Sequence, residues 1–144
     1  MHSGSILVTE PDMLKLAQLL EGQSRWPALE EEHRGGLGPV LASAQIVRDD
    51  EVPQDVITLH STVRAKDLEA GTDHKHALVM PEHASDAAGL VSVLSPLGAA
   101  LLGRREGDEI EYRVPGDTRR LMVQQVLYQP ERASFQREMA PFRK

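Results

Sequence analysis

The chain has 144 residues, of which 40% are hydrophobic and 26% are charged, so it is predicted to fold as one domain or as a small domain with an appendage. The 16 basic and 22 acidic residues give a formal net charge of −6, which disfavours direct, specific binding to nucleic acid. The absence of cysteine excludes disulfides and thiolate metal sites. The longest apolar run, residues 97–102, is too short to cross a membrane, and the N-terminal residues lack the pattern of a secretion signal. A cytoplasmic protein without a membrane partner is therefore expected.

The first 50 residues carry the pattern of two short amphipathic helices. Thr9 is the candidate N-cap of the first helix, and Gly22 is predicted to end it. Its apolar stripe is formed by Met13, Leu16, Ala17 and Leu20. The second helix is expected from about Pro39, with a stripe formed by Val40, Leu41, Ala44 and Val47. Because two short helices are not stable alone in water, residues 1–50 are predicted to form an antiparallel helical hairpin, a short coiled coil, against a larger domain.

From about Pro53 the hydrophobic pattern changes to that of β-strands. One short helix is predicted over residues 97–102, with Gly103 at its C-terminal end. The predicted strands are residues 56–63, 76–80, 90–94, 109–114 and 120–128. Short connections between them predict an α+β fold in which an antiparallel sheet packs on one helix over residues 51–129. Residues 130–144 have no periodicity and are predicted to form a flexible tail.

Local patterns that could carry catalytic or metal chemistry have simpler structural explanations. Residues 98–105 have the glycine spacing of a phosphate-binding loop, but arginines replace its lysine and its hydroxyl residue, which favours a helix ended by glycine. His74 and His76 lie two residues apart without an evident third metal ligand. We therefore predict no catalytic residue, no metal site and no cofactor.

The acidic run Glu30, Glu31 and Glu32 lies between the two predicted helices. The simpler interpretation is a solvated loop or helix start, where acidic side chains suit the helix dipole. The alternative is a set of oxygen ligands for Mg²⁺ at the tip of the helical hairpin. The local sequence favours the first interpretation and leaves the second open.

Four ordered motifs resemble one known family. They are residues 51–63 (EVPQDVITLHSTV), 94–103 (LSPLGAALLG), 106–108 (EGD) and 115–116 (PG). Together they resemble the C-terminal domain of the bacterial Gre transcript-cleavage factors over about residues 51–129. The resemblance implies an FKBP-like fold, a curved antiparallel sheet packed on one short helix. Residues 98–103, residues 128–130 and the short N-terminal part look closer still to the Rnk family, Gre-like regulators of nucleoside diphosphate kinase.

The resemblance also implies a partner and a docking surface. Gre factors dock on RNA polymerase at its secondary channel, and the segment similar to their docking loop is Leu94, Ser95, Pro96, Leu97 and Gly98. Leu94 departs from the pattern, because Gre factors often have an acidic or polar residue at this place. The acidic tip of the long Gre coiled coil brings Mg²⁺ to the polymerase active site.

The predicted helical arms decide whether transcript cleavage can carry over to this chain. Each arm has about 12 residues and is about 18 Å long, whereas the arms of Gre factors are more than twice as long. Glu30, Glu31 and Glu32 would thus lie near the channel mouth. The expected function is a non-enzymatic regulator that competes with Gre factors without cleaving transcripts. One alternative is an adaptor that acts directly on nucleoside diphosphate kinase, and a weaker one is a residual prolyl isomerase.

Overall fold

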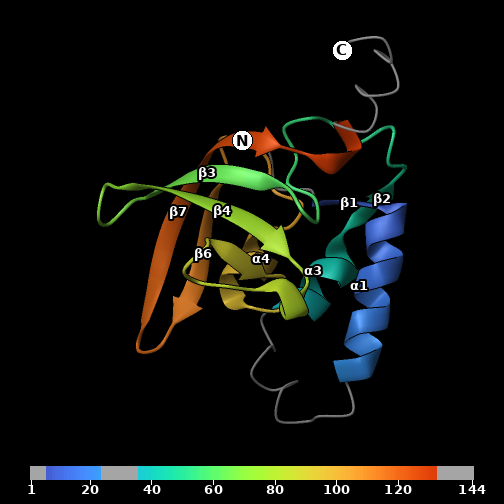
Figure 1. Cartoon of the computed structure of the whole chain (residues 1–144), viewed down its shortest axis with the longest axis horizontal. Helices are drawn as coiled ribbons and strands as arrows, with labels where there is room; N and C mark the ends of the chain where they lie inside the picture. Colours follow the sequence, from blue (N-terminus) through green and yellow to red (C-terminus); the bar gives the residue numbers. More distant parts are fainter. Residues whose placement is uncertain (1–5, 24–35, 133–144) are drawn as a thin grey trace.

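The structure is a computed structural model that describes residues 6–23 and 36–132. Figure 1 shows a curled sheet with the helix α4 against one face and the helices α1 and α3 beside it. The elements, in chain order, are β1 (Leu7–Thr9), α1 (Glu10–Gln23), α3 (Leu37–Ser43), β2 (Gln45–Val47), β3 (Thr62–Asp67), β4 (Asp73–Val79), the 3-10 helix η1 (Pro81–His83), β5 (Leu90–Ser92), α4 (Pro96–Leu101), β6 (Glu109–Val114) and β7 (Asp117–Tyr128). The predicted α+β class is confirmed.

The helix α1 begins as predicted and ends later. The Thr9 Oγ1 atom accepts a hydrogen bond from the Asp12 backbone N–H at 3.3 Å, which confirms the predicted N-cap. The helix continues past Gly22 to Gln23, so the predicted C-terminal end is wrong. Leu16 is fully buried, but Ala17 is exposed, because the helix turns Asp12 inward.

The second helix, α3, is shorter than predicted. Ala44 has an extended backbone (φ −76°, ψ 148°), and the following residues form β2. The Gln45 N–H donates to the Ile6 carbonyl at 2.7 Å, and β2 pairs in parallel with β1, so that Val47 lies opposite Thr9. Strand pairing with a segment almost 40 positions away thus replaces the last helical turn. The antiparallel coiled coil stays a prediction, because residues 24–35, with Glu30, Glu31 and Glu32, lie outside the described residues.

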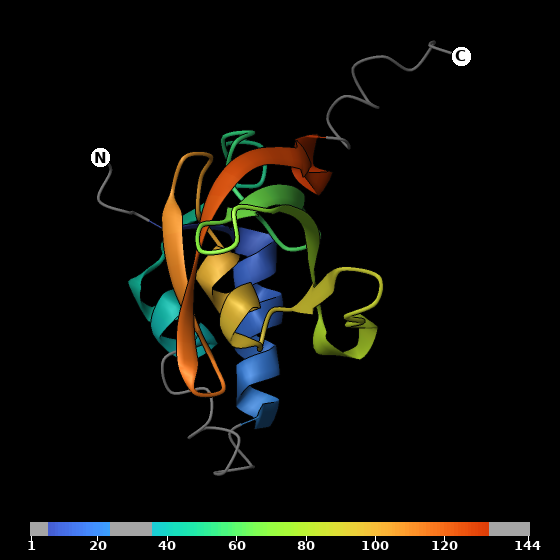
Figure 2. The same cartoon turned by 90° about the vertical axis from the view of Figure 1, so that its left-hand side faces the viewer.

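The main sheet has the strand order β5-β4-β3-β7-β6. All its neighbouring strands are antiparallel except β4 and β5, which run parallel, so the expectation of a purely antiparallel sheet is wrong at this edge. The reason is that η1 and the following turn reverse the chain twice before β5 begins. Figure 2 shows α4 between the β6–β7 hairpin (orange) and the β4–β5 segment (yellow-green).

The strand predicted over residues 56–63 is wrong in its position. The chain turns there, since Ser61 N–H donates to the Thr58 carbonyl at 2.9 Å and His60 has a φ of 75°. Ile57 and Leu59 are buried as the alternating pattern predicted, but Thr58 is buried as well. The alternation of apolar and polar residue types imitated a strand, whereas residues 56–59 form an irregular loop that is buried throughout, and β3 begins only at Thr62.

One hydrophobic core joins both parts of the chain. Leu101 and Leu102 of the α4 region are 0% and 1% exposed, which confirms their predicted burial. They share this core with Val8, Leu16 and Leu37 from the N-terminal part. Ordered contacts continue past the predicted tail boundary to residue 132, so the expected flexible tail is wrong for residues 130–132, whereas residues 133–144 lie outside the described part. None of the described helices is long and apolar enough to span a membrane.

Candidate functional site

The predicted docking segment forms a rigid corner between β5 and α4. The Ser95 Oγ atom accepts a hydrogen bond from the Gly98 N–H at 3.0 Å and donates one to the Ser92 carbonyl at 2.7 Å. Pro96 occupies the first turn of α4, where a missing N–H costs nothing. The Ser92 Oγ atom also accepts from the Leu94 N–H at 3.0 Å. The side chains of Ser92 and Ser95 therefore supply hydrogen-bond partners for the backbone groups of this corner.

Only part of the segment is accessible to a partner. Leu94 is 9% exposed and belongs to the core, and Gly98 is buried. A Cβ atom at Gly98 would lie 1.9 Å from the Ser92 carbonyl oxygen, so this position needs glycine for the close approach of α4 to β5. Pro96 is exposed, and Ser95 and Leu97 are half-buried. The accessible surface of the corner is thus Ser95, Pro96 and Leu97, while Leu94 and Gly98 hold its shape.

A buried polar cluster fixes the helix α1 to the loop that precedes β3. The Asp12 carboxylate accepts a hydrogen bond from the Leu59 N–H at 3.1 Å, and the Thr58 hydroxyl donates to Glu131 at 2.8 Å. The Ser61 Oγ atom accepts from the Thr58 N–H at 2.9 Å. Burial raises the pKa of the Asp12 carboxyl, and the hydrogen bond from Leu59 opposes this shift. Burial also raises the pKa of Glu131.

Sequence reasoning missed this cluster. Asp12 has the ordinary position of an acidic residue in a first helical turn, and Glu131 lies in a segment without periodicity. Their partners are 47 and 73 positions away in the chain. No local pattern carries such a signal.

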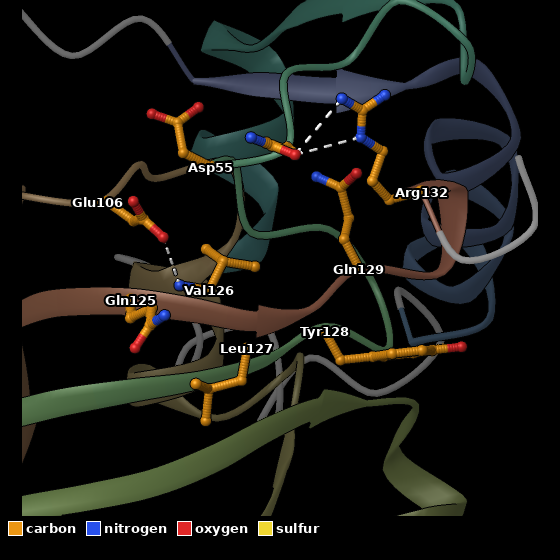
Figure 3. Close-up of a pocket in the computed structure, with 9 residues that line it drawn as sticks. Asp55, Glu106, Gln125, Val126, Leu127, Tyr128, Gln129 and Arg132 are labelled. Carbon is orange, nitrogen blue, oxygen red and sulfur yellow. Dashed lines mark hydrogen bonds between the residues drawn. The ribbon is translucent and has the colours of Figure 1, made fainter. Parts of the chain in front are cut away.

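A pocket of about 370 Å³ lies at the end of β7, and no sequence pattern predicted it. Figure 3 shows Gln125, Leu127 and Tyr128 along one side of this pocket and Asp55 and Arg132 along the other. It opens where β7 continues beyond the last residue paired with β6, Met122.

The histidine pair on β4 has no third candidate metal ligand beside it within the described ranges. The rings of His74 and His76 stack with centroids 6.2 Å apart, and burial lowers the pKa of His76. Within residues 6–23 and 36–132, no group of three or more histidine, aspartate or glutamate side chains could hold a metal ion. The acidic run Glu30 to Glu32 lies outside these ranges.

Comparison with known proteins assigns the chain to a family. A model of the family described as "Transcription elongation factor, GreA/GreB, C-term" matches residues 52–128, which is more than half of the chain. The chain belongs to the GreA/GreB family. The family match contains the whole β5–α4 corner and the pocket-lining end of β7.

Similar proteins extend the match beyond this Gre-type region. The "Regulator of nucleoside diphosphate kinase" of Escherichia coli strain K12 is 35% identical over 134 residues, which cover 92% of this chain and 96% of that protein. The "Transcription elongation factor GreA" of Thermotoga neapolitana is 34% identical over 117 residues, which cover 78% of this chain and 74% of that protein. The resemblance to the Rnk and Gre families is confirmed, and these relatives are named as regulators or elongation factors.

A solved structure agrees with the fold. The "Prokaryotic transcription elongation factor GreA/GreB from Nitrosomonas europaea" is 33% identical, with a TM-score of 0.70. The alignment covers 86% of this chain and 100% of that one. A Gre-family chain of this short format therefore has a similar fold across the helical and sheet parts.

Proposed function

We propose that this Gre-family protein is a non-enzymatic regulator that docks on RNA polymerase at the rim of the secondary channel. The observation that carries the proposal is the β5–α4 corner, which presents the exposed Pro96 next to the half-buried Ser95 and Leu97 on a backbone fixed by side-chain hydrogen bonds. Small rigid surfaces of this kind suit protein docking, because binding energy concentrates in a few central residues. RNA polymerase is a cytoplasmic partner, and a cytoplasmic location follows from it.

The short helices support a regulator that does not stimulate transcript cleavage. The helix α1 has 14 residues and α3 has 7, so the longer of them extends about 21 Å at about 1.5 Å per residue. An arm of this length holds its tip near the channel mouth, far from the catalytic ion of the polymerase. The protein would then occupy the Gre site and exclude Gre factors without supplying Mg²⁺.

Docking is tested with a double substitution at the corner. Pro96→Asp with Leu97→Lys should weaken binding to purified RNA polymerase by at least about tenfold, or about 1.4 kcal/mol, because both accessible apolar surfaces are lost. Pro115→Asp, an exposed proline at the turn between β6 and β7, is the matched control and should bind like the parent. Circular dichroism should show the same fold for all three proteins. Equal binding by all of them would contradict the assignment of the corner.

Competition is tested on backtracked transcription complexes. The protein alone should release no short 3′ RNA fragments, and in excess it should slow cleavage stimulated by a Gre factor. Replacing Glu30, Glu31 and Glu32 with alanine should leave this competition nearly unchanged, since the corner supplies the contact. Cleavage by the protein alone would refute the non-cleaving role.

Direct action on nucleoside diphosphate kinase is a second candidate function. The name of the similar Escherichia coli protein, "Regulator of nucleoside diphosphate kinase", favours it. Binding of this chain to the purified kinase and to the purified polymerase, measured side by side, separates the two functions. Affinity for the kinase that survives Pro96→Asp with Leu97→Lys would favour the adaptor.

A further inference from the structure

The sheet face opposite α4 brings two cations together, and no ion pair with an acidic side chain of residues 6–23 or 36–132 balances them. In the β3–β4 register, Arg64 lies directly opposite Lys75, and across β7 it lies opposite Gln125. Both cationic side chains are exposed. Like charges directly opposite each other destabilise a sheet, so this pairing is unfavourable unless an anion lies across it.

The other cations near this pair are balanced. Lys66 lies opposite Asp73 in the register, and Arg120 forms an ion pair with Glu69 at 3.4 Å. The unbalanced positive charge on this part of the face is therefore local to Arg64 and Lys75. A net charge of −6 for the whole chain conceals such a local excess.

An exposed aromatic ring and an amide continue this surface along β7. The Arg64 Nη1 atom donates to the Gln125 side-chain oxygen at 3.1 Å, which holds the guanidinium beside β7. Tyr128 lies opposite Thr62, on the same face, and is 47% exposed. We call Arg64, Lys75, Gln125 and Tyr128 the outer-face patch.

The outer-face patch leads into the pocket at the end of β7. Gln125 and Tyr128 belong to both, and Arg132 stands on the opposite side of the pocket (Figure 3). The surface therefore presents, in order, the cations Arg64 and Lys75, the ring of Tyr128 beside the pocket, and the cation Arg132. A phosphate, a base and a further phosphate follow one another in the same way along a single strand of nucleic acid.

The pocket itself is rich in hydrogen-bond acceptors. The carboxylates of Asp55 and Glu106 line it. The Glu106 carboxylate accepts from the Val126 N–H at 2.8 Å, and Asp55 pairs with Arg105 at 3.3 Å. Because carboxylate and amide oxygens accept hydrogen bonds, such a pocket favours a base with an exocyclic amino group, as in cytosine.

We propose that the outer-face patch and this pocket bind single-stranded RNA. Arg64 and Lys75 contact one phosphate, Arg132 contacts another, and one base stacks on Tyr128 at the pocket. The other contacts are with the backbone, so the base at the pocket, with its preference for an exocyclic amino group, is the one source of sequence dependence in this binding mode. The inference goes beyond the proposed function, because it requires no contact with polymerase.

The charge contacts are tested by fluorescence anisotropy with a labelled oligocytidylate of about 12 nucleotides at about 50 mM salt. The parent protein should bind with an affinity that falls steeply as salt rises. Arg64→Glu and Lys75→Glu should each weaken binding by at least about tenfold and reduce the salt dependence. Arg113→Glu makes the same change of charge at an exposed position of β6 and should weaken binding by less than about threefold.

The base contacts are tested by conservative substitution and by the choice of oligonucleotide. Tyr128→Ala should weaken binding by about tenfold, whereas Tyr128→Phe, which keeps the ring, should bind like the parent. Oligocytidylate should bind several-fold more tightly than oligouridylate, because the pocket supplies acceptors. Thermal melting of each variant checks that the fold is retained.

Three results would overturn the proposal. The first is the absence of RNA binding by the folded parent protein at low salt. The second is equal binding by Lys75→Glu and Arg113→Glu. The third is an acidic peptide of the same length that binds the parent as tightly as RNA does and binds the Tyr128→Ala variant equally well, since that result would assign the face to an acidic protein segment.

Discussion

Single buried side chains set how this protein responds to pH. Asp12 lies almost wholly inside the fold, where its carboxylate holds the Leu59 N–H, and burial raises its pKa above the ordinary value. The unfolded chain releases this proton at about pH 3.9, whereas the folded protein releases it at higher pH. Between these two values the folded state binds more protons, so the free energy of unfolding falls as pH rises, and the loss is complete above the folded pKa.

Asp12→Asn should therefore flatten the pH dependence of stability in the acid range. The amide oxygen can still accept the Leu59 hydrogen bond, and no charge has to be buried. At neutral pH this variant should be at least as stable as the parent, whereas Asp12→Ala should lose about 1–3 kcal/mol, because the Leu59 N–H is left unpaired. Urea unfolding at several pH values between 4 and 7 measures both effects. A parent and an Asp12→Asn variant with parallel pH profiles would show that Asp12 does not control the response.

At the scale of an element, α4 depends on one hydroxyl. The Ser95 Oγ atom caps the N-terminus of a helix of only 6 residues, and that helix supplies Leu101 to the core. Because a short helix has few internal hydrogen bonds, its cap contributes a large share of its stability. The same cap shapes the proposed docking corner.

Ser95→Ala should destabilise the protein by about 1 kcal/mol, the usual cost of losing an N-cap. Ser95→Asp keeps an acceptor for the Gly98 N–H and places a negative charge at the helix N-terminus, so it should retain most of the stability. The midpoints of urea unfolding compare the two variants. Equal destabilisation by alanine and aspartate would mean that the hydrogen bond to the Ser92 carbonyl, which only serine can donate, matters more than the cap.

At the scale of the whole molecule, the helical part and the sheet share one core. The Leu7 N–H donates to the Gly103 carbonyl at 3.4 Å, and Leu16 and Leu37 pack with the α4 residues. Removing residues 1–49 would therefore uncover apolar surface on the sheet domain, at about 25 cal/mol for each Å² exposed.

A fragment of residues 50–132 should keep strand-type circular dichroism and unfold cooperatively, but at a lower urea concentration than the whole chain. Its sheet is complete, while its core has lost Val8, Leu16 and Leu37. A chain of residues 1–132 is the control for the missing C-terminal residues. If the fragment and this control unfold at the same urea concentration, the two parts are independent domains.

The sequence by itself determined the features that depend on neighbours in the chain. The Thr9 cap, the β6–β7 hairpin at Gly116 and the helix ended by Gly103 follow from local backbone chemistry, and the four Gre-type motifs lie within short segments. Distant contacts decided the rest. Val47 joins a strand because β1 offers it a partner, Asp12 is buried because Leu59 presents an N–H, and Arg64 meets Lys75 only through the register of the sheet. Local periodicity predicts which residues are buried. Only the tertiary structure determines which residues contact one another, because these contacts depend on the packing of the whole core.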